Sequence, residues 1–211
     1  MSIRAPSANL APPTYETLQA GSPLHRVHLT AYGGTSFNPC AGQPTRFAPI
    51  VDANGSCVPS LYAGSSLDSV IYETIFHDVP ARAAFKTVRR QEVLIRSHAE
   101  LQTGRRFTLV SLRQPDLKRW RIGRSQLIAS GPKLYPKTAR WAEAIHHRFP
   151  KADGLVWTSN QCDPDSAYLF FGDRVAPADF VLAASRNGAT DKSFLADVRQ
   201  AGRRAGIVIT I

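Results

Sequence analysis

The stretch SLYAGSSLDSVIYETI, residues 60–75, predicts a short strand followed directly by a helix. Residues 60–63 read as the strand, and Ser65 or Ser66 is a good N-cap because its hydroxyl can accept a hydrogen bond from a free backbone N–H of the first turn. At about 100° per residue the apolar positions of the helix share one face, while Glu73 lies more than about 100° from the centre of that face. Glu73 is therefore expected beside the buried stripe and not within it.

The remaining segments alternate between the two element types. Alternating or continuous apolar runs predict strands, and capped segments with apolar positions at helical spacing predict helices. An Asp-Ala-Asn-Gly sequence at 52–55 indicates a tight turn. The mixture predicts an α+β fold with a mixed, bent sheet. The predicted strands are 24–29, 92–97, 107–112, 154–159, 167–171 and 207–211, and the predicted helices begin at Thr138, ending before Pro150, and at Asp191, ending at Gly206.

The length and composition favour one compact domain. The chain has 211 residues, of which 43% are apolar, enough for a sizeable core. Its 29 Gly and Pro residues are scattered, which indicates many short elements and ordered loops. Residues 1–22 are rich in Ala, Pro and Ser and are expected to form an extended N-terminal arm, with the domain covering 23–211.

Cysteine usage and hydropathy point to an ordinary intracellular protein. The three cysteines, Cys40, Cys57 and Cys162, are odd in number and form no C-x-x-C or Cys/His cluster, so we expect free thiols and neither a disulfide framework nor a metal site. No stretch approaches the roughly 18 apolar residues of a membrane span, and the first residues lack the apolar run of a secretory signal. These features predict a cytoplasmic location without a membrane partner.

Positive charge is concentrated in the middle of the chain. Residues 82–151 hold 17 Lys or Arg against four acids, an excess of 13, whereas the whole chain has a net charge of +10, so the remainder carries −3. Such a block suits a phosphate-bearing ligand, a nucleic acid, an acidic protein partner or a solvated face. No helix-turn-helix, RNA-binding aromatic motif or zinc finger accompanies it, so specific nucleic-acid binding by the chain alone is not expected.

A few polar residues stand in local settings that suit chemistry. Arginine grips phosphates because its planar fork makes two parallel charge-assisted hydrogen bonds; Arg26 and Arg46 lie outside the basic block, although each can instead pair with an acid at a strand edge. The ring of Tyr62 can stack on a ligand; alternatively, Tyr62 is an ordinary buried residue of the core. Ser159 follows a buried strand, where side chains reach pockets, and Asn160 adjoins it. Ser159 lacks a nucleophile elbow, so we assign it to substrate positioning.

The ordered series of these segments resembles the RES-domain family, which is named for its Arg, Glu and Ser. The likeness spans residues 22–211 and depends on the following segments: LHRV at 24–27, FNP at 37–39, RF at 46–47, LYAGS at 61–65, YE at 72–73, DGLVWTS at 153–159 and AGRRAGIVI at 201–209. Between Arg46 and Tyr62 this chain has 15 residues, more than the family pattern leads one to expect, and we expect the surplus to form a longer hairpin.

The resemblance implies a fold similar to ADP-ribosyltransferase toxins and a toxin enzyme that consumes NAD, commonly paired with an Xre-like antitoxin. It carries functional roles onto Arg26, Arg46, Tyr62, Glu73 and Ser159. NAD is then a substrate and no cofactor is implied. Homo-oligomers and toxin–antitoxin hetero-oligomers both fit this reading, and the sequence does not choose between them.

The chemistry of these residue types agrees with that reading. Breaking the nicotinamide–ribose bond leaves positive charge on the sugar, which a carboxylate such as Glu73 stabilises when water is excluded. Arg46 and Tyr62 complete the predicted catalytic set, and Arg26, Arg46, Tyr62, Ser159 and Asn160 the NAD-binding set. The acceptor of ADP-ribose, whether water, phosphate or a protein, stays open. A transferase acting on a protein and a basic nucleic-acid-binding protein are the alternatives.

Overall fold

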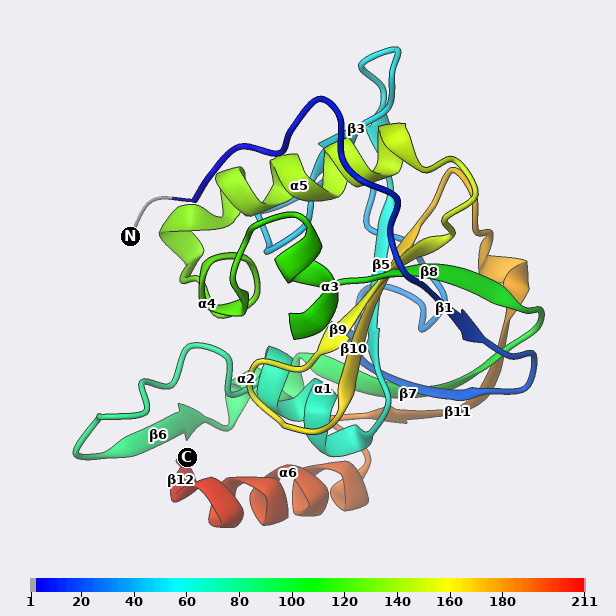
Figure 1. The fold of residues 1–211 in the computed structure, drawn as a ribbon. Coiled ribbons are helices and arrows are strands. Elements are labelled where there is room, and N and C mark those ends of the chain that lie inside the picture. The colour runs from blue at the N-terminus through cyan, green and yellow to red at the C-terminus, as the bar shows by residue number, and fades with distance from the viewer. Residues whose placement is uncertain (1–2, 211) are drawn as a thin grey trace.

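The computed structural model describes residues 3–210 as a single-domain α+β fold built on an eight-stranded mixed sheet (Figure 1). Neighbouring strands are antiparallel except β8 and β9, which are parallel. The strands in spatial order are β1 (Tyr15–Leu18), β8 (Phe107–Ser111), β9 (Gly154–Thr158), β10 (Ser166–Phe171), β5 (Ser60–Gly64), β2 (Pro23–Leu29), β7 (Arg96–Thr103) and β11 (Phe180–Asn187).

The sheet curls so that strands far apart in its order meet on the concave face. Strands β8 and β11 are separated by five others, yet the rings of Phe107 and Phe180 lie 5.3 Å apart. Phe170 of the central strand β10 contacts both rings at 5.1 Å. One apolar cluster therefore forms almost entirely from strand side chains, and burial of these large rings stabilises the bent sheet that the sequence predicts.

Helices cover the sheet in two groups (Figure 1). Helix α1 (Leu67–Thr74) and helix α6 (Lys192–Ala205) share one core cluster with β2, the small parallel pair β6 (Lys86–Arg89) and β12 (Ile207–Thr210), and the short helix α2 (Gln91–Leu94). The other group packs on the β8–β9–β10 part of the sheet. It comprises α3 (Gln114–Arg119), α4 (Arg124–Leu127), the 3-10 turn η1 (Pro132–Leu134) and α5 (Tyr135–Arg148). A second 3-10 turn, η2 (Pro177–Asp179), leads into β11.

The N-terminal segment is extended and packs closely on the second group of helices. Ile3 and Leu10 are buried in its core cluster. The indole N–H groups of Trp141 and Trp120 donate to the backbone carbonyls of Arg4 and Ala11, at 2.8 and 2.9 Å. The segment then forms β1, an edge strand of the main sheet, so it contributes to the fold from both its apolar side chains and its backbone.

Several sequence predictions need correction. The strand expected over 92–97 is instead the short helix α2 followed by β7, which continues to Thr103 because it pairs on both sides, with β2 and β11. Helix α5 begins at Tyr135 and not at Thr138, because a proline in the first turn lacks only an N–H that the helix would leave unpaired.

The turn at 52–55 joins β3 (Ile50–Val51) to β4 (Cys57–Val58), and this is the longer hairpin that was expected.

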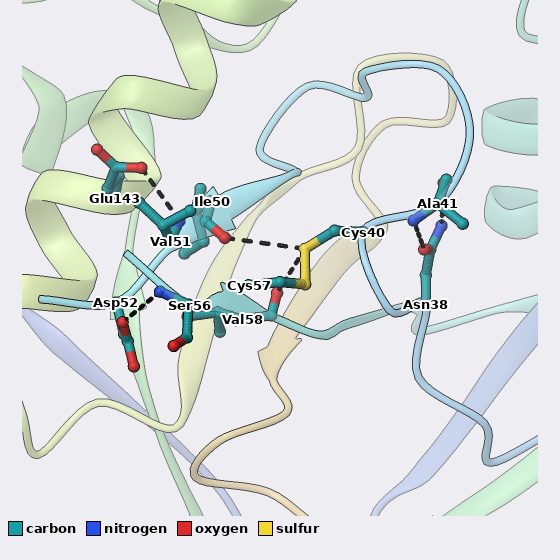
Figure 2. Close-up of a disulfide and its surroundings, with 10 residues drawn as sticks. All are labelled: Asn38, Cys40, Ala41, Ile50, Val51, Asp52, Ser56, Cys57, Val58 and Glu143. Carbon is teal, nitrogen blue, oxygen red and sulfur yellow. Dashed lines mark hydrogen bonds between the residues drawn. A yellow bond between two sulfur atoms is a disulfide. The ribbon is translucent and has the colours of Figure 1, made fainter. Parts of the chain in front are cut away.

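The expectation of three free thiols is wrong. Cys40 and Cys57 form a disulfide whose Cα atoms lie 6.2 Å apart, whereas Cys162 is free and buried. Figure 2 shows the bond clipping the loop after Asn38 to the β3–β4 hairpin. The prediction failed because the two cysteines are separated by 17 residues with no local motif, and only the folded hairpin brings them together.

We expect the disulfide to stabilise the fold measurably. Closing a loop of this size lowers the entropy of the unfolded chain, which corresponds to about 3 kcal/mol. The double variant Cys40→Ser, Cys57→Ser should therefore lose about that much free energy of unfolding in urea titrations. Adding a reductant to the wild type should reproduce the loss, and equal stability of oxidised and reduced wild type would contradict the bond.

None of the helices within residues 3–210 is long and apolar enough to cross a membrane.

Candidate active site

Helix α1 places Glu73 in its last turn, facing the loop that follows β9. Ser66 is the N-cap: its hydroxyl accepts from the Ser69 N–H, and the Ser69 hydroxyl accepts in turn from the Ser66 N–H. The carboxylate of Asp165 accepts hydrogen bonds from the Ser65 and Ser66 hydroxyls, at 2.9 and 2.8 Å. The start of the helix is thus tied to the far end of the same loop.

One oxygen of the Glu73 carboxylate is fixed by three donors. Its Oε1 accepts from the Ser159 hydroxyl at 2.6 Å and from the backbone N–H groups of Asn160 and Gln161 at 2.7 and 3.1 Å. The other oxygen, Oε2, forms no hydrogen bond with any residue in 3–210. Glu73 is half-buried beside the apolar stripe, as its helical position predicts. The carboxylate is therefore held in one orientation with one oxygen available to a ligand.

Ser159 is fully buried and serves the carboxylate. Its hydroxyl donates to Glu73 and accepts from the Cys162 N–H at 3.0 Å, and its exposed fraction is 0%. We predicted that this serine positions substrate directly. In the structure it lies behind Glu73, so the positioning it provides acts through that carboxylate.

Arg46 is a buried cation without an acidic partner among the described residues. Its side chain is 7% exposed, and it forms no ion pair with the acidic groups of residues 3–210. Its Nη1 donates to the Ser130 carbonyl at 3.0 Å, and its Nη2 lies 3.5 Å from the Tyr135 hydroxyl, with the guanidinium 5.2 Å from the centre of that ring. Buried charges are normally paired, so the lack of an acidic partner within residues 3–210 makes Arg46 a candidate for binding an anion.

Tyr62 holds the loop that carries Arg46. Its hydroxyl accepts from the Phe47 N–H and bonds to the Thr45 hydroxyl, each at 3.0 Å, so the residues on both sides of Arg46 are tied to β5. Burial raises the pKa of Tyr62 to about 12, and it remains a neutral phenol. Its ring stands edge-on to Trp157 with the centres 6.2 Å apart. The longer hairpin after Arg46 has not moved this loop away from Tyr62.

We expect Tyr62→Phe to destabilise the protein by about 1–2 kcal/mol, because the buried Phe47 N–H loses its acceptor. Urea unfolding measures this effect. Tyr15→Phe, at a tyrosine that is 41% exposed on the edge strand β1, is the matched control and should leave stability unchanged. Equal stability of the two variants would show that the Tyr62 hydroxyl does not hold the loop.

Arg26 lines a cleft of about 420 Å³ together with Tyr62, His28 and Thr74. Its Nη1 donates to the carbonyls of Gly34 and Ser36, at 2.8 and 2.7 Å. Burial lowers its pKa to about 10, which still leaves it charged at neutral pH. Like Arg46 it has no acidic partner within residues 3–210, so the alternative of a strand-edge ion pair does not apply. Thr45 and Ala48, on either side of Arg46, line the same cleft.

Tyr135 contacts Arg46 through its hydroxyl and its ring, and no local sequence pattern marked it as a site residue. Burial raises the pKa of Tyr135; the positive charge of Arg46 opposes the shift, while the negative charges of Glu73 and Asp78 add to it. Its hydroxyl is also 2.8 Å from Nε2 of His77. The charges of Arg46 and Glu73 thus both influence the pKa of Tyr135, in opposite directions.

Asn160, whose backbone N–H holds Glu73, lines a second hollow. This hollow, of about 370 Å³, is also lined by Arg113, Arg124 and Thr158. Arg124 donates to the Ser159 carbonyl at 3.0 Å, which was not foreseen from the sequence. Of the predicted site residues, Arg26 and Tyr62 line the larger hollow and Asn160 lines the smaller one, whereas Arg46, Glu73 and Ser159 line neither of the two.

A separate cluster of His25, His98 and Glu100 has ligand atoms within 4.8 Å of one another. Arg186 donates to Nδ1 of His98, so in the neutral ring the proton sits on Nε2 and points to Nδ1 of His25, 3.0 Å away. Burial, followed by the charge of Arg186, lowers the pKa of His98 to about 3 and keeps it neutral. His98 then has no lone pair left for a metal, and the cluster is a hydrogen-bonded link between strands.

Comparisons with known proteins identify the family of this chain and a solved structure with a similar fold. The RES domain family matches residues 23–190. No curated protein matches the chain. Among solved structures, a chain in "Crystal structure of the M.tuberculosis MbcT-MbcA toxin-antitoxin complex" superimposes with a TM-score of 0.63 at 10% identity, covering 87% of this chain and 92% of that one. At that identity the likeness concerns the fold. With its family match over most of its length, and with the Arg, Glu and Ser for which the family is named in one neighbourhood, this chain belongs to the RES domain family.

Proposed function

We propose that this protein is a toxin enzyme that cleaves NAD at the nicotinamide–ribose bond and passes ADP-ribose to water or phosphate. The observation that carries the proposal is the buried Arg46 guanidinium, which has no acidic partner within residues 3–210 and contacts Tyr135. The charge of Glu73 also acts on the pKa of that tyrosine, and one oxygen of the Glu73 carboxylate forms no hydrogen bond with the described residues. A dinucleotide supplies both missing charges: a pyrophosphate for the arginine and a developing sugar cation for the carboxylate.

The residues suggest a division of labour. When the C1′–N bond breaks, nicotinamide keeps the electron pair and the ribose becomes an oxocarbenium-like cation. Glu73, with Oε1 held by Ser159 and two backbone N–H groups, presents Oε2 to that cation without having to reorganise. A water or phosphate oxygen then attacks C1′, and for water the released proton leaves to solvent. Tyr62 and Arg26 line one cleft, which is also lined by Thr74, the residue after Glu73.

Product analysis tests the reaction. Purified protein is incubated with NAD, with and without phosphate, and the products are separated by chromatography. Free nicotinamide with ADP-ribose indicates hydrolysis, a phosphorylated ADP-ribose that appears only with phosphate indicates phosphorolysis, and ADP-ribose found on a protein by mass spectrometry indicates the transferase alternative. NAD left intact over hours in every condition would refute the proposal.

We also propose an acidic or apolar protein antitoxin of the Xre-like kind as the partner. The similar solved structure is titled a toxin–antitoxin complex, and the positive excess of residues 82–151 suits such a partner. Co-purification with the protein encoded beside this chain tests it, and recovery of no such partner would count against it. The nucleic-acid alternative predicts instead tight DNA or RNA binding at physiological salt that weakens steeply as salt rises.

A further inference from the structure

A chain of hydrogen bonds runs from an exposed acid to the buried arginine. Asp78 Oδ1 lies 2.7 Å from Nδ1 of His77, and Nε2 of His77 lies 2.8 Å from the Tyr135 hydroxyl. Tyr135 in turn contacts Arg46 through both its hydroxyl and its ring. Asp78 and His77 follow the end of α1, and His77 is four residues after Glu73, so one helix end supplies both the carboxylate and this chain of contacts.

The donors and acceptors along the chain can be assigned. A carboxylate accepts, so Nδ1 of the neutral His77 ring carries the proton and donates to Asp78. Nε2 then holds a lone pair and accepts from the Tyr135 hydroxyl. Because the hydroxyl hydrogen of Tyr135 points to His77, the lone pairs of the phenol oxygen face Nη2 of Arg46. The opposite tautomer of His77 would turn the hydroxyl proton toward a cation, which is repulsive.

Within residues 3–210 these contacts leave part of one edge of the Arg46 guanidinium, the edge formed by Nε and Nη2, unused. Nη1 is directed to the carbonyl and hydroxyl of Ser130, at 3.0 and 3.4 Å, and one hydrogen of Nη2 faces Tyr135. The Nε–H and the second Nη2–H form no hydrogen bond with residues 3–210. Two adjacent N–H groups on one edge are the fork that binds two oxygens of a phosphate.

We propose that Asp78, His77 and Tyr135 are positioning residues that fix this free edge of Arg46 toward the phosphates of the substrate. The inference rests on the proposed function for the identity of that substrate. Asp78 has a side chain that is 89% exposed, so its pair with His77 adds little stability of its own, and its role is to select the His77 tautomer. The hydroxyl of the buried Tyr135, oriented by His77, in turn orients the guanidinium of Arg46.

Two ligands separate the inference from the function on which it rests. ADP carries two phosphates but no nicotinamide bond. Calorimetry of ADP binding therefore measures phosphate binding by Arg46 without any reaction. His77→Leu removes the acceptor for the tyrosine hydroxyl and should weaken ADP binding about three- to tenfold, the range for one lost hydrogen bond. His77→Gln keeps an acceptor close to Nε2 and should bind ADP within about twofold of wild type. In NAD cleavage, His77→Leu should raise KM by a similar factor with kcat nearly unchanged.

The control is His147→Leu, which removes the histidine that contacts the Val51 carbonyl, away from the site. It should bind ADP like the wild type, and thermal melts verify that each variant folds. ¹⁵N NMR of the His77 ring should show the proton on Nδ1. Unchanged ADP affinity in folded His77→Leu, or a proton on Nε2, would overturn the inference. If the wild type binds ADP but leaves NAD intact, the proposed function fails while the affinities still decide the role of His77 and Tyr135.

Discussion

Replacement of Glu73 by glutamine is expected to slow nicotinamide release from NAD by about 100- to 1000-fold, the usual loss when one preorganised electrostatic group is removed from an active site. The amide oxygen can still accept from Ser159, Asn160 and Gln161, so the loop after β9 keeps its position. The substitution therefore removes the negative charge while leaving the surroundings intact. The loss should appear in kcat, with KM little changed.

The matched control for this prediction is Asp68→Asn on the same helix. Asp68 pairs with Arg204 at 3.3 Å, and both side chains are exposed to solvent. We therefore expect the charge of Asp68 to have no part in the reaction. Its kinetics should match the wild type. Steady-state assays of nicotinamide release decide the matter: a Glu73→Gln variant that retains more than about a tenth of the wild-type kcat would mean that its carboxylate does not stabilise the sugar cation.

Replacement of Arg46 by lysine is expected to weaken the binding of ADP and NAD by about 30- to 100-fold, although the charge is kept. Lysine offers a point charge and cannot present the two-hydrogen fork or the flat stack on Tyr135. Because a ligand stabilises the state that binds it, ADP should raise the melting temperature of the wild type and leave that of Arg46→Lys nearly unchanged.

Arg140→Lys serves as the control, since Arg140 is an exposed residue of α5 in the same basic segment. It should respond to ADP like the wild type. If instead both variants keep the thermal shift of the wild type, the binding comes from general positive charge, which lysine preserves, and not from the fork of the buried arginine.

Local patterns predicted those parts of the fold that depend on neighbouring residues. The strand–helix unit at 60–75, its serine cap and the position of Glu73 follow from spacing along one segment, and the last helix with its Asp191 cap follows in the same way. The curl of the sheet could be expected only in outline, because contacts such as Phe107 with Phe180 join residues 73 positions apart.

The missed features are all contacts between distant segments. Tyr135 lies before Thr138, where the sequence predicts that the helix begins, whereas in the structure it begins α5 and contacts Arg46. His77 lies in no motif, and its contact with Tyr135 forms only where the segment after α1 meets the start of α5. Ser159 was placed correctly at the end of a strand, but its partner Glu73 lies 86 residues away, so its burial behind that carboxylate could not be foreseen.

The most direct test of this account is a crystal structure of the Glu73→Gln variant with NAD bound. We predict that two oxygens of the pyrophosphate lie within hydrogen-bonding distance of Nε and Nη2 of Arg46, and that the ribose carbon attached to nicotinamide lies against the side chain at position 73. Well-occupied NAD whose phosphates avoid Arg46, or whose nicotinamide ribose lies away from position 73, would contradict it.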